Sequence, residues 1–284
     1  MPDPAVPQGT LYVVATPLGN LEDVTLRALR VLRDVSLVAC EDTRHTRKLL
    51  EAHGIRTPTS SYFEHNERQK GAQILETLQA GRDVALVSDA GTPAISDPGY
   101  RLVRGAREAG IAVIPVPGAS AATAALSVCG LPTDRFLFVG FLPAKPGARR
   151  KALGALAGER PTLVIYESPL RVVESLADML AALGDRDAFL CREATKLHEE
   201  YVRAPLSSLR ERLAARDRVK GEIVLVVAGA PEAPLASEDP AALYRQLSAQ
   251  GRTRREAVKE AARRLGRPAR EVYALVQQAE LEAE

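Results

Sequence analysis

Strand-like apolar runs alternate with helix-like patterns from the start of this chain, and no other feature limits its fold more. This alternation is typical of βα units, whose strands assemble into a mainly parallel sheet. The apolar runs predict strands at 11–15, 37–40, 59–62, 83–87 and 111–116. The patterns that follow them predict helices at 25–35, 43–52, 67–80, 98–109 and 120–129. We therefore expect an α/β fold whose first domain contains a five-stranded parallel sheet.

The middle of the chain predicts a second α/β domain after a turn-rich break at 130–134. Strands are expected at 136–140, 162–166, 188–191, 199–203 and 223–228. Helices are expected at 151–156, 170–183 and 206–216. Residues 196–203 have the pattern of a hairpin arm, so this second sheet is expected to be mixed.

The last part of the chain predicts a linker and a small helical domain. Residues 231–240 have the composition of a linker, and helical patterns follow at 241–250, 254–265 and 268–282. The turn at Gly266 gives the last two the pattern of a helix-turn-helix-like unit. Residues 252–270 hold eight basic and two acidic side chains, a net charge of +6. The expected domains are 1–130, 131–230 and the basic tail 231–284.

The composition indicates a soluble protein of a reducing compartment. Of 284 residues, 46% are hydrophobic, enough for buried cores, and no apolar run approaches the roughly 20 residues of a membrane helix. The N-terminus lacks the pattern of a secretory signal. Cys40, Cys129 and Cys191 lie far apart in apolar contexts, which favours core residues over disulfides or metal ligands. We expect a cytoplasmic protein with no membrane partner and no metal ion.

The loop Ser88–Gly99 is the strongest candidate for a ligand site, because open parallel sheets bind ligands where their strands end. Gly91 allows a ligand to approach the backbone closely. Asp97 precedes Pro98 and matches the pattern of a helix N-cap. Asp89 has no such structural explanation, so ligand binding and loop bracing are weighed equally for it.

Three further strand ends carry polar loops. The loop at 16–20 lacks the glycines of a dinucleotide fingerprint, and Ser120 can cap the next helix or face a ligand. The loop at 40–48 holds acidic residues that suit the first turn of a helix. Its cations run against the helix dipole and suit phosphate contacts instead. His45 is a lone histidine without a spaced partner.

Eight motifs, taken in order, resemble the bacterial small-subunit ribosomal RNA cytidine 2′-O-methyltransferases of the tetrapyrrole methylase superfamily. Any single motif is weak, but the ordered set covers nearly the whole chain. The motifs are Ala15-Thr-Pro-Leu-Gly-Asn-Leu-Glu-Asp23, Glu41-Asp-Thr-Arg44, Ser88-Asp-Ala-Gly-Thr-Pro-Ala-Ile-Ser-Asp-Pro-Gly99, Pro117-Gly-Ala-Ser120, Phe141-Leu-Pro-Ala-Lys145, Tyr166-Glu-Ser-Pro169, Cys191-Arg-Glu-Ala-Thr-Lys196 and Lys220-Gly-Glu222.

The resemblance implies two α/β domains with S-adenosylmethionine bound in the cleft between them, and a homodimer. It implies transfer of a methyl group to the ribose of a cytidine in small-subunit ribosomal RNA. Thr-Pro-Leu-Gly-Asn and Asp-Ala-Gly-Thr-Pro replace the glycine-rich loops of most tetrapyrrole methylases, which favours the RNA branch over the alternative of a small-molecule methylase. The implied cofactor-binding residues are Leu18, Gly19, Asp89, Ala90, Gly91, Thr92, Ile95, Ser120, Ala121, Tyr166, Ala194 and Glu222.

The expected reaction needs a positioned ribose hydroxyl and gains from a general base. Asp89 and Glu41 are the first candidates for this base, and the other available side chains are Asp42, His45, Glu193 and Lys196. Aromatic residues make up only 4% of the chain, so phosphate contacts are favoured over base stacking. The expected RNA-binding residues are Arg44, Arg47, Lys48, Lys145, Arg149, Arg150, Lys151, Arg254, Arg255, Arg263 and Arg264.

Overall fold

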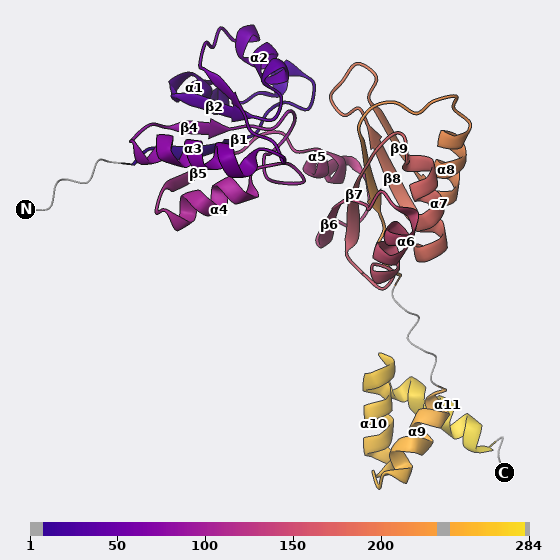
Figure 1. The fold of residues 1–284 in the computed structure, drawn as a ribbon. Helices are drawn as coiled ribbons and strands as arrows, with labels where there is room; N and C mark the ends of the chain where they lie inside the picture. Colours follow the sequence, from indigo (N-terminus) through magenta and orange to yellow (C-terminus); the bar gives the residue numbers. More distant parts are fainter. Residues whose placement is uncertain (1–7, 232–238, 282–284) are drawn as a thin grey trace, which may run out of the picture. The chain divides into compact units, whose positions relative to one another are not determined.

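The computed structural model describes residues 8–231 and 239–281 (Figure 1). Of the expected linker at 231–240, residues 232–238 lie outside the described residues, and Pro240 is already the first residue of a helix. The chain forms two compact units, residues 1–229 and residues 230–284. The first unit contains both sheets and the second contains helices alone.

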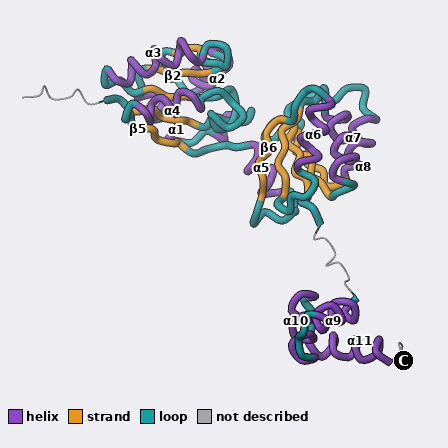
Figure 2. The backbone as a smooth tube through the Cα atoms, turned by 60° about the horizontal axis from the view of Figure 1, so that its bottom comes forward, coloured by secondary structure: helices purple, strands orange, loops and turns teal. Residues whose placement is uncertain are grey.

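The first sheet is parallel throughout, as predicted, with the strand order β3-β2-β4-β1-β5. Helices α1 and α2 pack over one face and α3 and α4 over the other, because their buried residues join different hydrophobic clusters. Figure 2 shows these strands as a layer between helices. The elements are β1 (Thr10–Val14), η1 (Leu21–Asp23), α1 (Leu26–Asp34), β2 (Leu37–Cys40), α2 (Thr43–Ala52), β3 (Thr59–Ser61), α3 (Glu67–Gln79), β4 (Val84–Leu86), α4 (Tyr100–Glu108) and β5 (Ala112–Val116).

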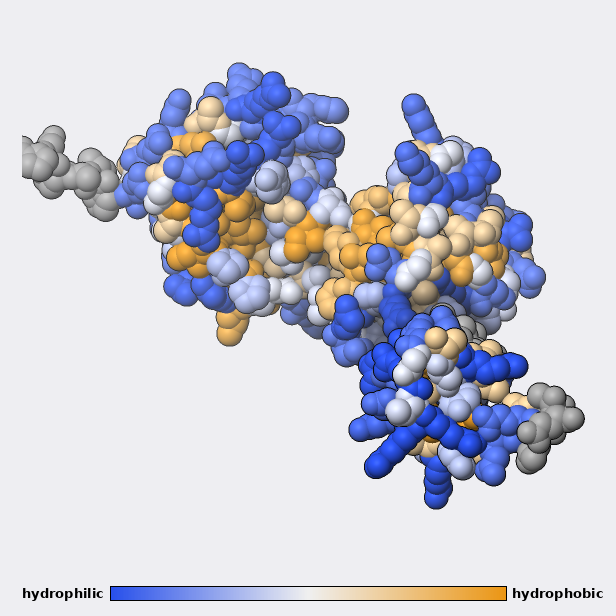
Figure 3. Space-filling view, turned by 90° about the horizontal axis from the view of Figure 1, so that it is seen from below, coloured by the Kyte–Doolittle hydropathy of each residue, from blue (hydrophilic) through white to orange (hydrophobic). Residues whose placement is uncertain are grey.

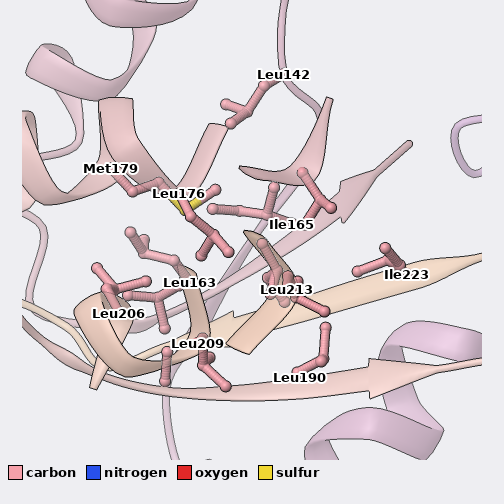
Figure 4. Packing of buried hydrophobic residues seen from close by; sticks show 14 of the residues in the cluster. Leu142, Leu163, Ile165, Leu176, Met179, Leu190, Leu206, Leu209, Leu213 and Ile223 are labelled. Atoms are coloured by element: carbon pink, nitrogen blue, oxygen red, sulfur yellow. The ribbon is translucent and has the colours of Figure 1, made fainter. Parts of the chain in front are cut away.

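The second sheet is mixed, as predicted, with the strand order β6-β7-β10-β8-β9. Strands β6 and β7 pair in parallel, and the other three pairings are antiparallel. One face carries α6, α7 and α8 on a leucine-rich cluster that includes Leu163, Leu176 and Leu209 (Figure 4). The elements are β6 (Phe136–Phe141), α6 (Pro146–Ala155), β7 (Thr162–Glu167), α7 (Val172–Leu183), β8 (Asp187–Arg192), β9 (Glu200–Pro205), α8 (Leu206–Ala214) and β10 (Ile223–Val227).

Helix α5 (Ala121–Val128) covers the other face of this second sheet. Its buried residues Ala125 and Leu126 join Val164, Phe189 and Val224 in one cluster. The expected domain boundary at 130 assigned this helix to the first domain, whereas its apolar side packs on the second. Helix α6 also begins at Pro146, five residues before the predicted start, because a proline is favourable in a first helical turn.

The helical unit has a core of its own. Its helices are α9 (Pro240–Ala249), α10 (Arg254–Leu265) and α11 (Ala269–Leu281), close to the predicted ranges. Leu247, Ala261 and Val272 are fully buried within its cluster. A capping box of Thr253 and Glu256 begins α10, and Gly266 ends it with a left-handed φ of 62°.

Two further observations concern the cysteines and membrane-spanning helices. Cys40, Cys129 and Cys191 are free and buried, so they are core residues as predicted. Within residues 8–231 and 239–281, no helix combines the length and apolar character needed to cross a bilayer.

Candidate active site

A single pocket of about 370 Å³ collects loops from both sheets of the first unit. The loops that follow β1, β4 and β5 supply one wall, and the ends of β6, β7, β8 and β10 supply the other. The lining residues are Leu18, Asp89, Ala90, Gly91, Thr92, Ile95, Ser96, Asp97, Ser120, Ala121, Phe141, Tyr166, Glu167, Ser168, Pro169, Cys191, Ala194, Glu222, Ile223 and Val224.

Eleven of the twelve expected cofactor-binding residues border this pocket, and the exception is Gly19. Gly19 has a φ of 136°, and a methyl group there would lie 2.7 Å from side-chain carbons of Lys196. This glycine therefore allows the loop after β1 to lie against the turn between β8 and β9.

Backbone hydrogen bonds hold the loop after β4 against its neighbours. The Thr16 N–H donates to the Gly91 carbonyl at 2.9 Å, and the Gly91 N–H donates to the Thr16 carbonyl at 3.0 Å. The Thr92 hydroxyl donates to the Ala119 carbonyl at 3.2 Å. Because three strand ends are tied in this way, the wall that they form is preorganised.

Backbone strain is concentrated in the two loops that face this pocket. Four non-glycine residues of the described chain have a positive φ, and they are Ala94, Ser96, Glu193 and Thr195. Each such residue costs on the order of 1–3 kcal/mol and persists where the surrounding structure holds it. Ser96 also lies close to Gly140 of β6, where a methyl group would meet its hydroxyl at 2.9 Å. Strain of this kind is typical of ligand sites.

Asp97 is not the helix cap that the sequence predicted. Helix α4 begins at Tyr100, and its N-cap is Gly99 with a φ of 140°. Pro98 and Gly99 form an extra turn before the helix, so Asp97 lies two residues too early and borders the pocket instead. Burial, followed by the negative charge of Glu41, raises the pKa of Asp97 to about 6.

Asp89 braces a loop and also borders the pocket. Its Oδ1 accepts a hydrogen bond of 3.0 Å from the Asp42 N–H, which joins the loops after β2 and β4. Glu41, the other expected catalytic residue, is half-buried beside this pair and is not among the lining residues. Burial first, and then the charges of Asp89 and Asp42, raise the pKa of Glu41. The negative charges of Asp89 and Asp42 therefore make Glu41 harder to ionise.

The second wall contains an ion network centred on Lys196. Its Nζ donates to Glu193 at 2.9 Å and to the pocket residue Glu222 at 3.0 Å. The Glu222 N–H also donates to Glu193 at 2.9 Å. Burial alone would lower the pKa of Lys196, but the hydrogen bonds to both carboxylates outweigh it and raise that pKa. Lys196 is therefore protonated at neutral pH and unsuited to act as a base.

Phe141 and Glu167 border the pocket but were not among the site residues expected from the sequence. Phe141 and Tyr166 meet edge to face with ring centroids 5.6 Å apart. Glu167 is 2% exposed and accepts from Ser175 at 2.6 Å and from Arg171 at 2.9 Å. The motifs that begin at Phe141 and Tyr166 marked these segments, but nothing in the spacing indicated which of their side chains reach the pocket. Ser120 occupies the N-cap of α5 without a side-chain capping bond.

The expected RNA-binding residues separate into buried and exposed groups. Arg149 is 2% exposed and bonds to Asp178 at 2.6 Å, so the prediction that it contacts RNA is wrong. Arg47 and Lys48 are exposed on α2, while Arg44 pairs with Asp42. Lys145, Arg150 and Lys151 are exposed around the start of α6. His45 does not border the main pocket but lines a smaller one with Leu21 and Thr46, and the two pockets share Asp89 in their linings.

Comparisons with known proteins agree on the family. The sequence profile of the tetrapyrrole (corrin/porphyrin) methylases matches residues 10–210. Ribosomal RNA small subunit methyltransferase I of Pseudomonas aeruginosa is 54% identical over 228 residues, which cover 79% of this chain and 81% of that protein. The protein of the same name from Halalkalibacterium halodurans is 46% identical over 277 residues, which cover 95% and 96%.

Solved structures show the same fold at low sequence identity. Uroporphyrin-III-C-methyltransferase from Thermus thermophilus superposes with a TM-score of 0.55 at 23% identity, over 77% of this chain and 94% of that one. A diphthine synthase superposes with a TM-score of 0.58 at 17% identity, over 77% and 89%. A shared fold of this kind carries no information on the substrate.

Proposed function

This chain belongs to the tetrapyrrole methylases and, within them, to the ribosomal RNA small subunit methyltransferase I family, and on that basis we propose that it methylates the ribose 2′-hydroxyl of a cytidine in small-subunit ribosomal RNA. The observation that carries the proposal is the pocket in which loops from both sheets meet. The alternative of a small-molecule methylase is not favoured, because the relatives of 46–54% identity are named as RNA methyltransferases.

S-adenosylmethionine is the proposed methyl donor, and the chemistry of the pocket suits it. A volume of about 370 Å³ lies in the usual range for small-molecule sites, roughly 300–1,000 Å³. Glu167 and Glu222 in its lining are paired with cations. Asp89 and Asp97 have no ion pair within the described part of the chain. Their negative charges suit a ligand with positively charged groups, as this donor has.

The acceptor hydroxyl gains from a general base, and Asp97, which borders the pocket, is our candidate for that role. The donor supplies an activated methyl group, so the protein has to hold the hydroxyl in line with it and remove its proton. With a pKa near 6, Asp97 is ionised at neutral pH and still accepts a proton readily. Glu41 and Asp89 then act through Asp97, because their negative charges help to raise its pKa.

The RNA surface of the first unit includes the exposed cations of α2 and of the start of α6. Arg47 and Lys48 lie on α2, the helix whose N-terminal loop is braced by Asp89. Lys145, Arg150 and Lys151 form a second exposed group. A homodimer and a cytoplasmic location are also proposed from the family resemblance. Light scattering in solution tests the dimer.

The decisive experiment transfers labelled methyl from S-adenosylmethionine to isolated small ribosomal subunits and then analyses the nucleosides. Recovery of 2′-O-methylcytidine supports the proposed function. Label on another nucleoside, or on a tetrapyrrole acceptor supplied in parallel, contradicts it.

A further inference from the structure

The basic charges of the helical unit are of two kinds, and only one kind is available to a partner. Arg254 pairs with Glu280 at 2.7 Å, and Arg267 pairs with Glu271 at 3.5 Å. Arg263 and Arg264 both bond to Glu260, at 2.6 and 3.1 Å. Three of the four tail residues expected to bind RNA are therefore already paired with carboxylates of their own unit, and Arg263 and Arg264 share the single charge of Glu260.

The other kind makes no ion pair within residues 239–281 and includes Arg270 of α11. Arg255 and Lys259 belong to this kind, and both are exposed on α10. They lie four residues apart, so they share one face of the helix with a rise of about 6 Å between them. Arg252 lies before the N-cap Thr253, outside the helix, and its charge is close to Glu256. We call Arg255 and Lys259 the α10 cation stripe.

The face of α10 next to these two cations is occupied by the core of the unit. Ala257, Val258, Ala261, Ala262 and Leu265 are buried there against α9 and α11. The α10 cation stripe therefore cannot turn inward, and its charges are held on a folded, rigid helix. Ordering such a surface on binding costs little, because the helix is already formed.

The surface around the stripe favours a nucleic acid over a lipid surface. Tyr273 is the single large apolar side chain of residues 239–280 that is exposed, and its ring lies under Arg254. Figure 3 shows that the visible face of this unit is mostly hydrophilic. A helix that lies in a membrane interface needs an apolar face to insert, and α10 has used its apolar face for the core.

We propose that the α10 cation stripe binds the phosphate backbone of ribosomal RNA, and that the ion-paired arginines around it do not. This inference rests on the proposed RNA substrate and names the surface that grips it. A nucleic acid strand carries a charge roughly every 3.4 Å along its duplex axis, so cations about 6 Å apart can face separate phosphates. Contacts of this kind position the enzyme without reading sequence.

The test compares two double variants of the full chain that remove the same charge from the same unit. The first is Arg255→Gln with Lys259→Gln in the stripe. The second is Arg264→Gln with Arg267→Gln, which removes two ion-paired arginines. Binding to isolated small ribosomal subunits is measured from about 50 to about 200 mM salt. Circular dichroism confirms that both variants keep their helices.

The stripe variant is expected to bind roughly tenfold more weakly, and its slope of log K against log salt should fall by about 1.4–1.8. The control variant should change both values much less. Equal losses in the two variants would show that net charge alone matters. No loss in the stripe variant would show that the stripe does not contact RNA. Either result overturns the proposal. So does a stripe variant that loses binding to anionic lipid vesicles but keeps its affinity for subunits.

Failure of this inference is distinguishable from failure of the proposed function. If the wild-type protein transfers no methyl to subunits, the proposed function fails. If it does transfer methyl and the stripe variant binds subunits normally, only the surface assignment fails.

Discussion

The pocket of the two-sheet unit and the surface of the helical unit carry unpaired charges of opposite sign. In the pocket, cations neutralise Glu167 and Glu222 and leave Asp89 and Asp97 without an ion pair within the described residues. On α10, carboxylates neutralise most arginines and leave Arg255 and Lys259. Each region thus carries the charge that suits the ligand proposed for it, a cationic methyl donor in the pocket and a polyanion on the helical unit.

This contrast teaches that net charge is a poor guide to either site. The whole chain carries a formal charge of only +2, because its 38 basic and 36 acidic residues nearly balance. The information lies in which charges are paired. Ion pairs exposed at the surface contribute little to stability, but they remove a charge from the set that a partner can use.

We expect the largest effect on stability at Arg149. This substitution distinguishes a cation with a structural role from cations available for binding. It is 2% exposed and bonds to Asp178, so Arg149→Ala should lower the free energy of unfolding by about 3–5 kcal/mol by leaving a charge without its partner. Chemical denaturation measures this loss. Arg150→Ala is the matched control on the exposed side of the same helix and should change stability little. Equal, small losses in both variants would place Arg149 among the surface cations after all.

Asp97 gives the largest effect on turnover. Asp97→Asn removes the proposed proton acceptor, so the turnover number should fall about 10²-fold or more while the fold is kept. In the wild type, activity should be lost as the pH falls through about 6, since protonated Asp97 cannot accept a proton. In the variant this step in the pH profile should be absent. A variant with full turnover, or with the wild-type pH step, would assign the base elsewhere.

Lys196 tests whether the second wall depends on its ion network. Lys196→Met removes the partner of Glu193 and Glu222, and the dissociation constant for S-adenosylmethionine should rise roughly tenfold, equivalent to about 1.4 kcal/mol. Lys196→Arg keeps the charge and should restore most of the affinity. Calorimetric titration measures both. Unchanged affinity in the methionine variant would show that Glu222 needs no support.

We expect the smallest effect at Thr253. Its substitution tests whether the helical unit unfolds independently of the two-sheet unit. Its side chain caps α10, so Thr253→Ala should cost about 1 kcal/mol, confined to the helical unit. Hydrogen exchange should show faster exchange in residues 240–281 and an unchanged rate in the sheets. Faster exchange throughout the chain would mean that the two units unfold together.

The first sheet and its ligand loops were predictable from sequence because parallel strands end at one edge. Gly91 and Ser120 follow different strands, yet the topology brings both to one pocket. The residues of the second wall were identified by family resemblance alone. The strands of a mixed sheet run in both directions, so strand order and direction have to be known before their ends can be placed together.

Two errors have local physical causes. Asp97 was mistaken for a helix cap because aspartate before proline is a common start signal, and the extra turn at Gly99 is invisible in the pattern. Arg149 was grouped with the RNA-binding cations because Arg150 and Lys151 follow it. Its partner Asp178 lies on α7, 29 residues away, and only tertiary packing brings the two together.

Calorimetric titration of S-adenosylmethionine tests the contrast between the two units most directly. The wild type and the Arg255→Gln, Lys259→Gln variant should bind the donor with the same dissociation constant, while Asp97→Asn should bind it several-fold more weakly. The proposed contrast between the pocket and the helical unit would be contradicted if the wild type bound no donor. It would also be contradicted if the helix variant lost donor affinity while Asp97→Asn kept it.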